Sequence, residues 1–176
     1  MDAGPILLQR PLSIASTETA LTLEDKLAKL GAAVLKSALE DIRQNKIDFK
    51  EQDISTVSLA PRLRKENGRI DWGKSALEIE RLIRGVINWP GAYTYYKGKI
   101  FKIYQAGILP EFPTGVSEPG KIIRVGDEGI LVTTGEGGLL IKELQLEGKR
   151  RMPAKEFISG HRIYTGETFE KNIAEY

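Results

Sequence analysis

Two stretches of the chain carry apolar residues at helical spacing. The first runs behind a possible capping box at Thr22 and Asp25 and predicts a helix over about 22–44. Its apolar stripe consists of Leu23, Leu27, Leu30, Val34, Ala38 and Leu39. The second follows a capping box at Ser75 and Glu78 and should end near 88–91, because Pro90 disfavours a helical residue before it.

From Ala92 onward the apolar period changes to two, which is typical of strands. A hairpin is predicted over 93–104, a second over 120–134, and a further strand over 139–146. Pro153 suits the first turn of a short helix. About five short strands with glycine-rich turns favour a small closed barrel of the oligonucleotide-binding kind, with a β-sandwich as the competing arrangement.

The N-terminal third is not a domain by itself. Residues 5–14 predict a strand, with Pro11 at a strand end or an edge position. One strand and one amphipathic helix cannot bury each other's apolar surface. We interpret residues 1–60 as the remnant of a larger α/β unit, whose helix stripe should lie partly bare. The alternative is that the helix packs on the rest of the chain.

Composition narrows the possible classes of protein. The 176 residues are 41% hydrophobic and 28% charged, which is typical of a globular chain of one or two domains. The absence of cysteine excludes disulfides and thiolate metal sites, and the single histidine, His161, excludes a multi-histidine metal site. No apolar run approaches the ~20 residues that span a bilayer, and no signal peptide follows Met1, so a cytoplasmic location is expected.

Charge is distributed unevenly along the chain. Residues 1–60 hold 7 Lys/Arg and 9 Asp/Glu, whereas residues 61–176 hold 19 and 15. The basic excess of the second part suggests a polyanionic partner, although ordinary surface charge is an equal alternative.

Basic and aromatic side chains alternate in the first hairpin, a pattern that can provide phosphate attraction and base stacking. We assign Tyr93 and Phe101 to the core, where Tyr104 could join them, and keep the lysines as candidates. The turn 148–152 is the best single phosphate-contact candidate. The candidate RNA contacts are Lys97, Lys99 and Lys102 of the hairpin, Lys149, Arg150 and Arg151 of this turn, and Arg62, Arg64 and Lys65 of a polar segment before residue 70.

Several motifs together resemble the methionyl-tRNA formyltransferase family. They are residues 22–31, 60–63, 66–72, 82–85, 88–94 and 144–152, in this order. The resemblance implies that 1–58 is the tail of a Rossmann-like formyltransferase domain, 59–74 a linker and 75–176 a tRNA-binding β-barrel domain. It also implies transfer of a formyl group from 10-formyltetrahydrofolate to methionyl initiator tRNA, without a metal.

The resemblance assigns one catalytic residue to this chain. The family uses an Asn, a His and an Asp, and only Asp2 has a match, in Asp2-Ala3-Gly4-Pro5. Asp2 and Gly4 would lie beside the folate. The Asn and His would belong to an N-terminal catalytic part, so the chain alone should be inactive. Two alternatives stay open: a stand-alone RNA-binding module, and part of a related sugar formyltransferase or folate-dehydrogenase hydrolase.

Overall fold

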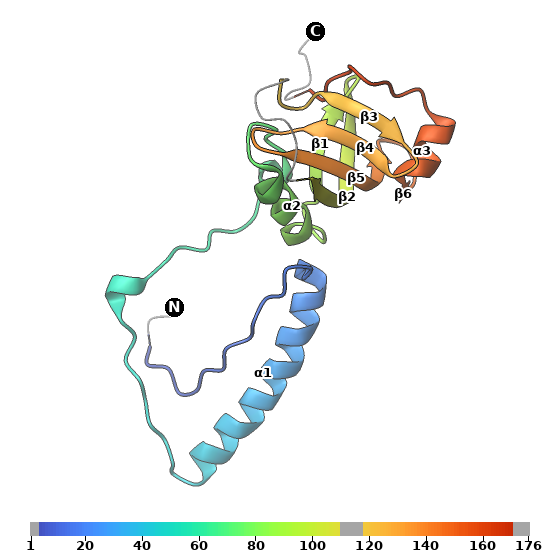
Figure 1. Cartoon of the computed structure of the whole chain (residues 1–176). Coiled ribbons are helices and arrows are strands. Elements are labelled where there is room, and N and C mark those ends of the chain that lie inside the picture. The colour runs from blue at the N-terminus through green and yellow to red at the C-terminus, as the bar shows by residue number, and fades with distance from the viewer. Residues whose placement is uncertain (1–3, 110–117, 171–176) are drawn as a thin grey trace. The chain divides into compact units, whose positions relative to one another are not determined.

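The computed structural model describes residues 4–109 and 118–170, which divide between two compact units, Met1–Arg62 and Leu63–Tyr176 (Figure 1). Within the first unit lie helix α1 (Ala20–Arg43) and the short 3-10 helix η1 (Ile54–Thr56). No helix in the described part of the chain has the length and apolar character needed to cross a membrane.

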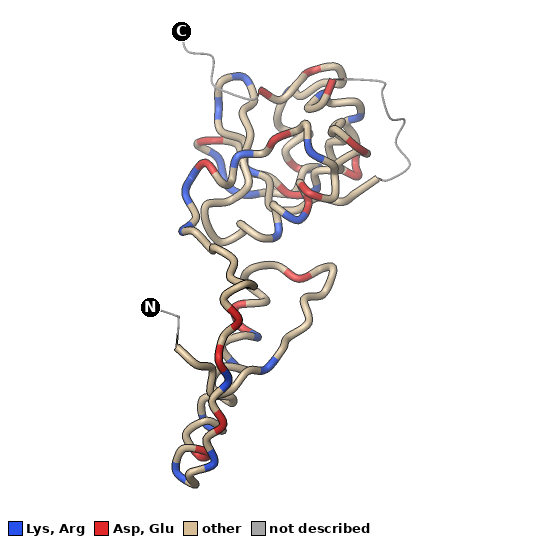
Figure 2. The backbone as a smooth tube through the Cα atoms, turned by 90° about the vertical axis from the view of Figure 1, so that its left-hand side faces the viewer, with Lys and Arg blue, Asp and Glu red and all other residues tan. Residues whose placement is uncertain are grey.

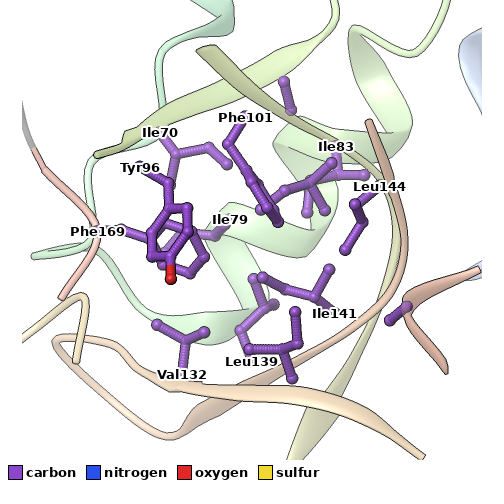
Figure 3. Packing of buried hydrophobic residues seen from close by; sticks show 14 of the residues in the cluster. Ile70, Ile79, Ile83, Tyr96, Phe101, Val132, Leu139, Ile141, Leu144 and Phe169 are labelled. Atoms are coloured by element: carbon purple, nitrogen blue, oxygen red, sulfur yellow. The ribbon is translucent and has the colours of Figure 1, made fainter. Parts of the chain in front are cut away.

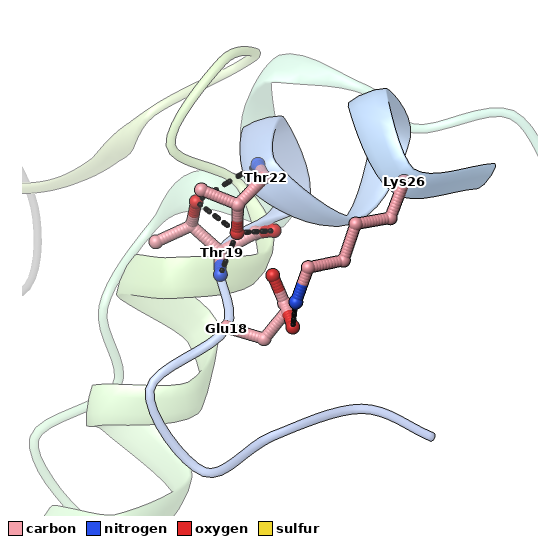
Figure 4. A network of polar contacts seen from close by, with 4 residues as sticks. All are labelled: Glu18, Thr19, Thr22 and Lys26. Carbon is pink, nitrogen blue, oxygen red and sulfur yellow. Dashed lines mark hydrogen bonds and ion pairs between the residues drawn. The ribbon is translucent and has the colours of Figure 1, made fainter. Parts of the chain in front are cut away.

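The predicted first helix is confirmed, but its predicted cap is wrong. Thr19 caps α1: its Oγ1 accepts a hydrogen bond from the Thr22 backbone N–H at 3.3 Å, and Thr22 Oγ1 accepts from the Thr19 N–H at 3.0 Å (Figure 4). Beside this reciprocal cap, Lys26 Nζ pairs with Glu18 Oε2 at 2.6 Å. Thr19 and Thr22 are both residues that can cap a helix. Thr19 is the N-cap because its backbone is extended, as at an N-cap, whereas Thr22 lies inside the helix.

The predicted strand over 5–14 does not form. In the described part of this unit, only an isolated antiparallel bridge joins Ile6 and Lys50, through backbone hydrogen bonds of 2.8 and 2.9 Å. Without a neighbouring strand, the segment cannot extend a ladder. As predicted, the apolar stripe of α1 is left partly bare: no residue of the helix is buried, and Leu27 is 49% exposed.

The second unit pairs six strands in one antiparallel sheet of order β1-β2-β5-β4-β3, with β6 beside β5. Its elements in chain order are η2 (Lys65–Gly68), α2 (Ala76–Gly85), β1 (Ala92–Tyr96), β2 (Lys99–Leu109), β3 (Ile122–Gly126), β4 (Gly129–Thr133), β5 (Gly138–Leu146), β6 (Met152–Pro153) and α3 (Ala154–Gly160). Both predicted hairpins, the later strand and both short helices are confirmed.

The predicted closed barrel is not confirmed, because the sheet is open. β1 and β3 are its two edge strands, and residues 166–170 bond to both. On one side, the Ile122 N–H donates to Glu167 O at 2.7 Å; on the other, the Glu170 N–H donates to Tyr95 O at 2.9 Å. An irregular segment therefore joins the edges where a closed barrel would have a strand ladder.

A single aromatic-rich core lies beneath this sheet. Phe101 of β2 is fully buried and contacts Phe169 at a ring-centroid distance of 5.0 Å (Figure 3). Trp72 stacks on Phe169 at a centroid distance of 5.4 Å and, although expected in the linker, is fully buried. Helix α2 contributes Ile79 and Ile83. Residues that precede the sheet in the sequence, lie within it or follow it thus share one apolar core.

Candidate nucleic-acid interface

The turn between β1 and β2 fixes the positions of Lys97 and Lys99, two of the candidate RNA contacts. Lys97 and Gly98 both have left-handed backbone, with φ of +51° and +71°, as a tight two-residue hairpin turn requires. Lys97 therefore lies at the turn itself, whereas Lys99 begins β2 at its exposed end. Lys102 lies three residues further along the same strand, half-buried.

Lys97 is tied to the segment that follows α3. Its Nζ pairs with Glu167 Oε1 at 2.7 Å, and the Tyr96 hydroxyl donates to Glu167 Oε2 at 2.5 Å. The hydrogen bond to Glu167 raises the pKa of Lys97. Lys97 therefore helps to hold residues 166–170 at the edge of the sheet. It could contact RNA only after its ion pair with Glu167 breaks.

Replacing Glu167 with glutamine should remove an acid-dependent part of the stability. Burial alone would raise the pKa of Glu167, but hydrogen bonds from Lys97, Tyr96 and the Tyr164 N–H outweigh it and lower the pKa below 4.5. Its contribution is present above the unfolded pKa and is lost as pH falls through the folded one. Urea unfolding at several pH values should show the wild-type advantage over Glu167→Gln shrinking below about pH 4.5. A pH-independent difference would contradict this, and the exposed Glu128→Gln serves as the control.

The outer face of the sheet carries aromatic side chains beside a lysine. In β1, Ala92, Thr94 and Tyr96 face the core, so Tyr93 and Tyr95 point to the opposite side. Assigning Tyr93 to the core was therefore wrong, while Phe101 is confirmed there. Tyr93 and Tyr95 meet edge to face at 5.8 Å, and burial raises the pKa of Tyr93.

Strand pairing fixes what lies next to Lys102. It stands opposite Tyr93 of β1 and Gln145 of β5, so the three residues form one row across the outer face. Next to this row is a shallow hollow of about 150 Å³ lined by Ile100, Lys102, Gln145 and Glu147. The Glu147 carboxylate accepts a hydrogen bond from the Ile100 N–H at 2.9 Å. Lys102 is therefore the one cation of this hollow, where it could meet a phosphate.

Arg151 lies over Tyr104 on the same face, next to a β-bulge. The register of β2 and β5 shifts between Ile103 and Gln105, so Tyr104 is the extra residue and remains half-buried outside the core. The Arg151 guanidinium lies over the Tyr104 ring at 4.3 Å and pairs with Glu143. The hydrogen bond to Glu143 raises the pKa of Arg151. Arg151 is thus held in place by a ring and a carboxylate.

The basic turn after β5 separates its three cations. Arg150 pairs with Glu156 of α3, and Arg151 with Glu143. Lys149 is exposed, and Gln145 Nε2 donates to its carbonyl at 2.8 Å, which anchors the turn to the outer face. Of the candidate lysines in the first hairpin and this turn, Lys99, Lys102 and Lys149 form no ion pair with any described residue, whereas Lys97 does; we call these three the unpaired lysines. Acidic positions alternate with basic ones elsewhere along the chain trace (Figure 2).

The basic segment before residue 70 is divided by the structure. Arg62 is exposed and ends the first unit, while Arg64 and Lys65 are exposed at η2 in the second. The Asn67 side chain accepts a hydrogen bond from the Arg64 N–H at 2.6 Å and so shapes this turn. Arg64 and Lys65 therefore belong to the same unit as the sheet, and Arg62 belongs to the first unit.

The expected catalytic residue, Asp2, lies outside the described residues. Gly4 is exposed, its carbonyl accepts from Gln52 Nε2 at 2.7 Å, and an added Cβ would have no atom within 4 Å. His161 stacks on Phe157 at 4.3 Å, with Nδ1 3.2 Å from the Phe157 carbonyl, as a structural residue would. In the described ranges, no three acidic or histidine side chains gather as metal ligands.

Comparison with known proteins identifies the class to which this fold belongs. Residues 62–162 match the family model described as formyl transferase, C-terminal domain, and the chain belongs to that family. It is 42% identical over 166 residues to the methionyl-tRNA formyltransferase of Geobacter sulfurreducens, covering 94% of this chain and 51% of the relative. The corresponding enzyme of Caldanaerobacter subterraneus is 41% identical, with 94% and 53% covered. The chain spans about half the length of these relatives.

Solved structures share the fold at low sequence identity. A variant of HypX from Aquifex aeolicus superposes with a TM-score of 0.65 and 19% identity, covering 90% of this chain and 28% of HypX. The sugar 3N-formyl transferase WlaRD superposes with a TM-score of 0.59 and 21% identity, covering 85% and 52%. The arrangement of strands and helices is therefore shared with these two solved structures.

Proposed function

We propose that this chain is the C-terminal portion of a methionyl-tRNA formyltransferase and that its second unit holds methionyl initiator tRNA in the cytoplasm. The observation that carries the proposal is the set of unpaired lysines. Lys102 lies beside outward-facing tyrosines, Lys149 is anchored to the same face through Gln145, and Lys99 is exposed where β2 begins. Lysine ammonium groups attract phosphates, and tyrosine rings can stack on bases. The names of the relatives support RNA as the polyanion.

The formyl transfer itself would need residues from another part of the enzyme. Attack of the methionyl amine on the formyl group gives a tetrahedral intermediate, whose oxyanion needs donors and whose amine must lose a proton. We propose that Asp2 orients and stabilises an imidazolium in that site, with Gly4 close to 10-formyltetrahydrofolate as co-substrate, and that no metal takes part. This chain has no match for the Asn and His of the family's site. It should therefore not transfer formyl groups alone.

The first unit would join that other part of the enzyme. The apolar stripe of α1 is partly exposed over several turns, including Leu27 at 49% and Leu39 at 58%. An amphipathic helix of this length stabilises a fold only when its apolar face is covered. We propose that residues 1–58 complete a Rossmann-like formyltransferase domain whose N-terminal catalytic part covers this stripe, and that 59–74 link it to the RNA-binding residues 75–176.

Binding and activity measured on the same chain test this proposal. Initiator tRNA should bind with an affinity that falls steeply between 50 and 200 mM salt, with a log–log slope of at least about −3, close to one unit for each unpaired lysine that contacts a phosphate. With 10-formyltetrahydrofolate and charged tRNA, the chain alone should give no product, and adding the N-terminal half of a relative should restore transfer. Salt-independent binding would contradict the proposed RNA interface. Turnover by the chain alone would contradict the proposal that formyl transfer needs residues from another part of the enzyme. Binding that never supports transfer would favour a stand-alone RNA-binding module.

A further inference from the structure

The two tryptophans of the chain occupy opposite environments. Trp72 is fully buried, and its Nε1–H donates to Thr94 Oγ1 at 3.1 Å. Trp89, in the loop between α2 and β1, is 48% exposed. A single exposed apolar side chain is common on protein surfaces. A tryptophan also offers a large flat ring that can stack on a ligand, so its surroundings indicate what it could bind.

The loop that carries Trp89 is held firmly by its neighbours. The Gly91 N–H donates to Val86 O at 2.8 Å, which folds the loop back onto the end of α2. On its other side, η2 packs directly on the loop: a Cβ added to Gly68 would lie 2.1 Å from Gly91 O and 3.0 Å from Pro90 Cγ. No side chain fits between these backbones. The backbone that follows Trp89 is therefore held in place.

Positive charge lies on both sides of this loop. Lys102 passes over Gly91, since a Cβ there would be 3.9 Å from Lys102 Cδ. Gly68 belongs to the turn that begins with Arg64 and Lys65, both exposed and without an ion pair among the described residues. Glu66 is the one carboxylate of the same turn. The loop thus joins the outer-face lysine to a second basic site.

We propose that Trp89 stacks on a single-stranded nucleobase of the bound RNA, whose flanking phosphates contact Lys102 on one side and Arg64 and Lys65 on the other. This inference rests on the proposed RNA-binding function and defines the element that is recognised. Base-on-aromatic stacking between backbone-tracking cations is how proteins hold unpaired nucleotides. An apolar protein partner would bury the indole but would not need three cations around it, so charge complementarity favours RNA.

Intrinsic fluorescence tests the stacking, because only one tryptophan is accessible. The full chain is titrated with two RNA probes of equal length, a hairpin with a single-stranded loop and a blunt duplex. The hairpin should quench the exposed indole, and Trp89→Phe should abolish the quenching because Trp72 is shielded. Trp89→Leu should weaken hairpin binding by about 5- to 150-fold, since stacking contributes about 1–3 kcal/mol per base, while the salt slope stays unchanged.

The controls distinguish a failure of Trp89 stacking from a failure of the proposed RNA binding. Leu77→Ala removes an exposed apolar side chain of α2, 44% exposed, and should leave hairpin affinity unchanged. An unchanged melting temperature of Trp89→Leu shows that the fold is intact. If Trp89→Leu binds the hairpin as tightly as wild type, or if the duplex quenches equally, stacking is refuted while RNA binding stands. If the wild-type chain binds neither probe, the proposed function fails with it.

Discussion

Replacing Phe169 with alanine should lower the free energy of unfolding of the second unit by about 3–5 kcal/mol, the cost of removing a large ring from a closed core. Phe169 is 2% exposed and contacts the rings of Trp72, Tyr96 and Phe101 at 5.0–5.7 Å between centroids. Its backbone also fixes the junction of the sheet edges, because its N–H donates to Gly120 O at 2.9 Å. Urea unfolding followed by tyrosine and tryptophan fluorescence measures the loss.

A matched substitution in the same segment shows whether the effect comes from the core. Tyr164 is 54% exposed, and Tyr164→Ala should change the free energy of unfolding by less than about 1 kcal/mol. If Phe169→Ala is as mild as Tyr164→Ala, residues 166–170 do not complete the core as described.

Reversing the charge of the three unpaired lysines should nearly abolish RNA binding. The triple variant Lys99→Glu, Lys102→Glu and Lys149→Glu should lose roughly 100-fold or more in affinity for initiator tRNA at low salt, because each contact to a phosphate is charge-assisted. Its log–log salt slope should become shallower by about 3, one unit for each lost contact. Filter binding or fluorescence anisotropy over a range of salt concentrations measures both quantities.

That experiment needs a control that changes the net charge equally at other positions of the chain. Lys36, Lys46 and Lys50 are exposed lysines of the first unit that form no ion pair among the described residues. Changing these three to glutamate alters the net charge by the same amount and should leave affinity within about threefold, because the proposal places no phosphate contact on them and exposed charges outside the contact surface are screened by salt. Equal losses in both triple variants would mean that the outer face is not the binding surface.

Local sequence patterns determined the helices and hairpins, since each depends on neighbouring residues. The capping box at Ser75 and Glu78 forms as predicted, and Lys97-Gly98 makes the expected turn. The open sheet, whose two edges are joined by an irregular segment, was not predictable in this way. It depends on residues 166–170 reaching both edge strands, a contact between segments that are far apart in the sequence.

The sequence indicated which types of residue occur in the candidate interface, but not on which face of the sheet each side chain lies or which partner it has. The run Tyr93-Thr94-Tyr95-Tyr96 has aromatic residues on both faces of a strand, and the inward face is set by Thr94, whose hydroxyl bonds to Trp72 and to Glu170 O. The bulge at Tyr104, which places that ring under Arg151, has no signal in the sequence. Nor did the pattern reveal that Glu167 already holds Lys97.

The position of Phe169 along the chain also affects how the domain is made. On the ribosome, all six strands emerge before the ring that fills the centre of their core. Until that ring arrives, the nascent sheet has an apolar hole and two unpaired edges, features that favour aggregation and chaperone binding. Folding of this domain during translation should therefore be late and abrupt, with native packing appearing only after residue 170 has left the exit tunnel.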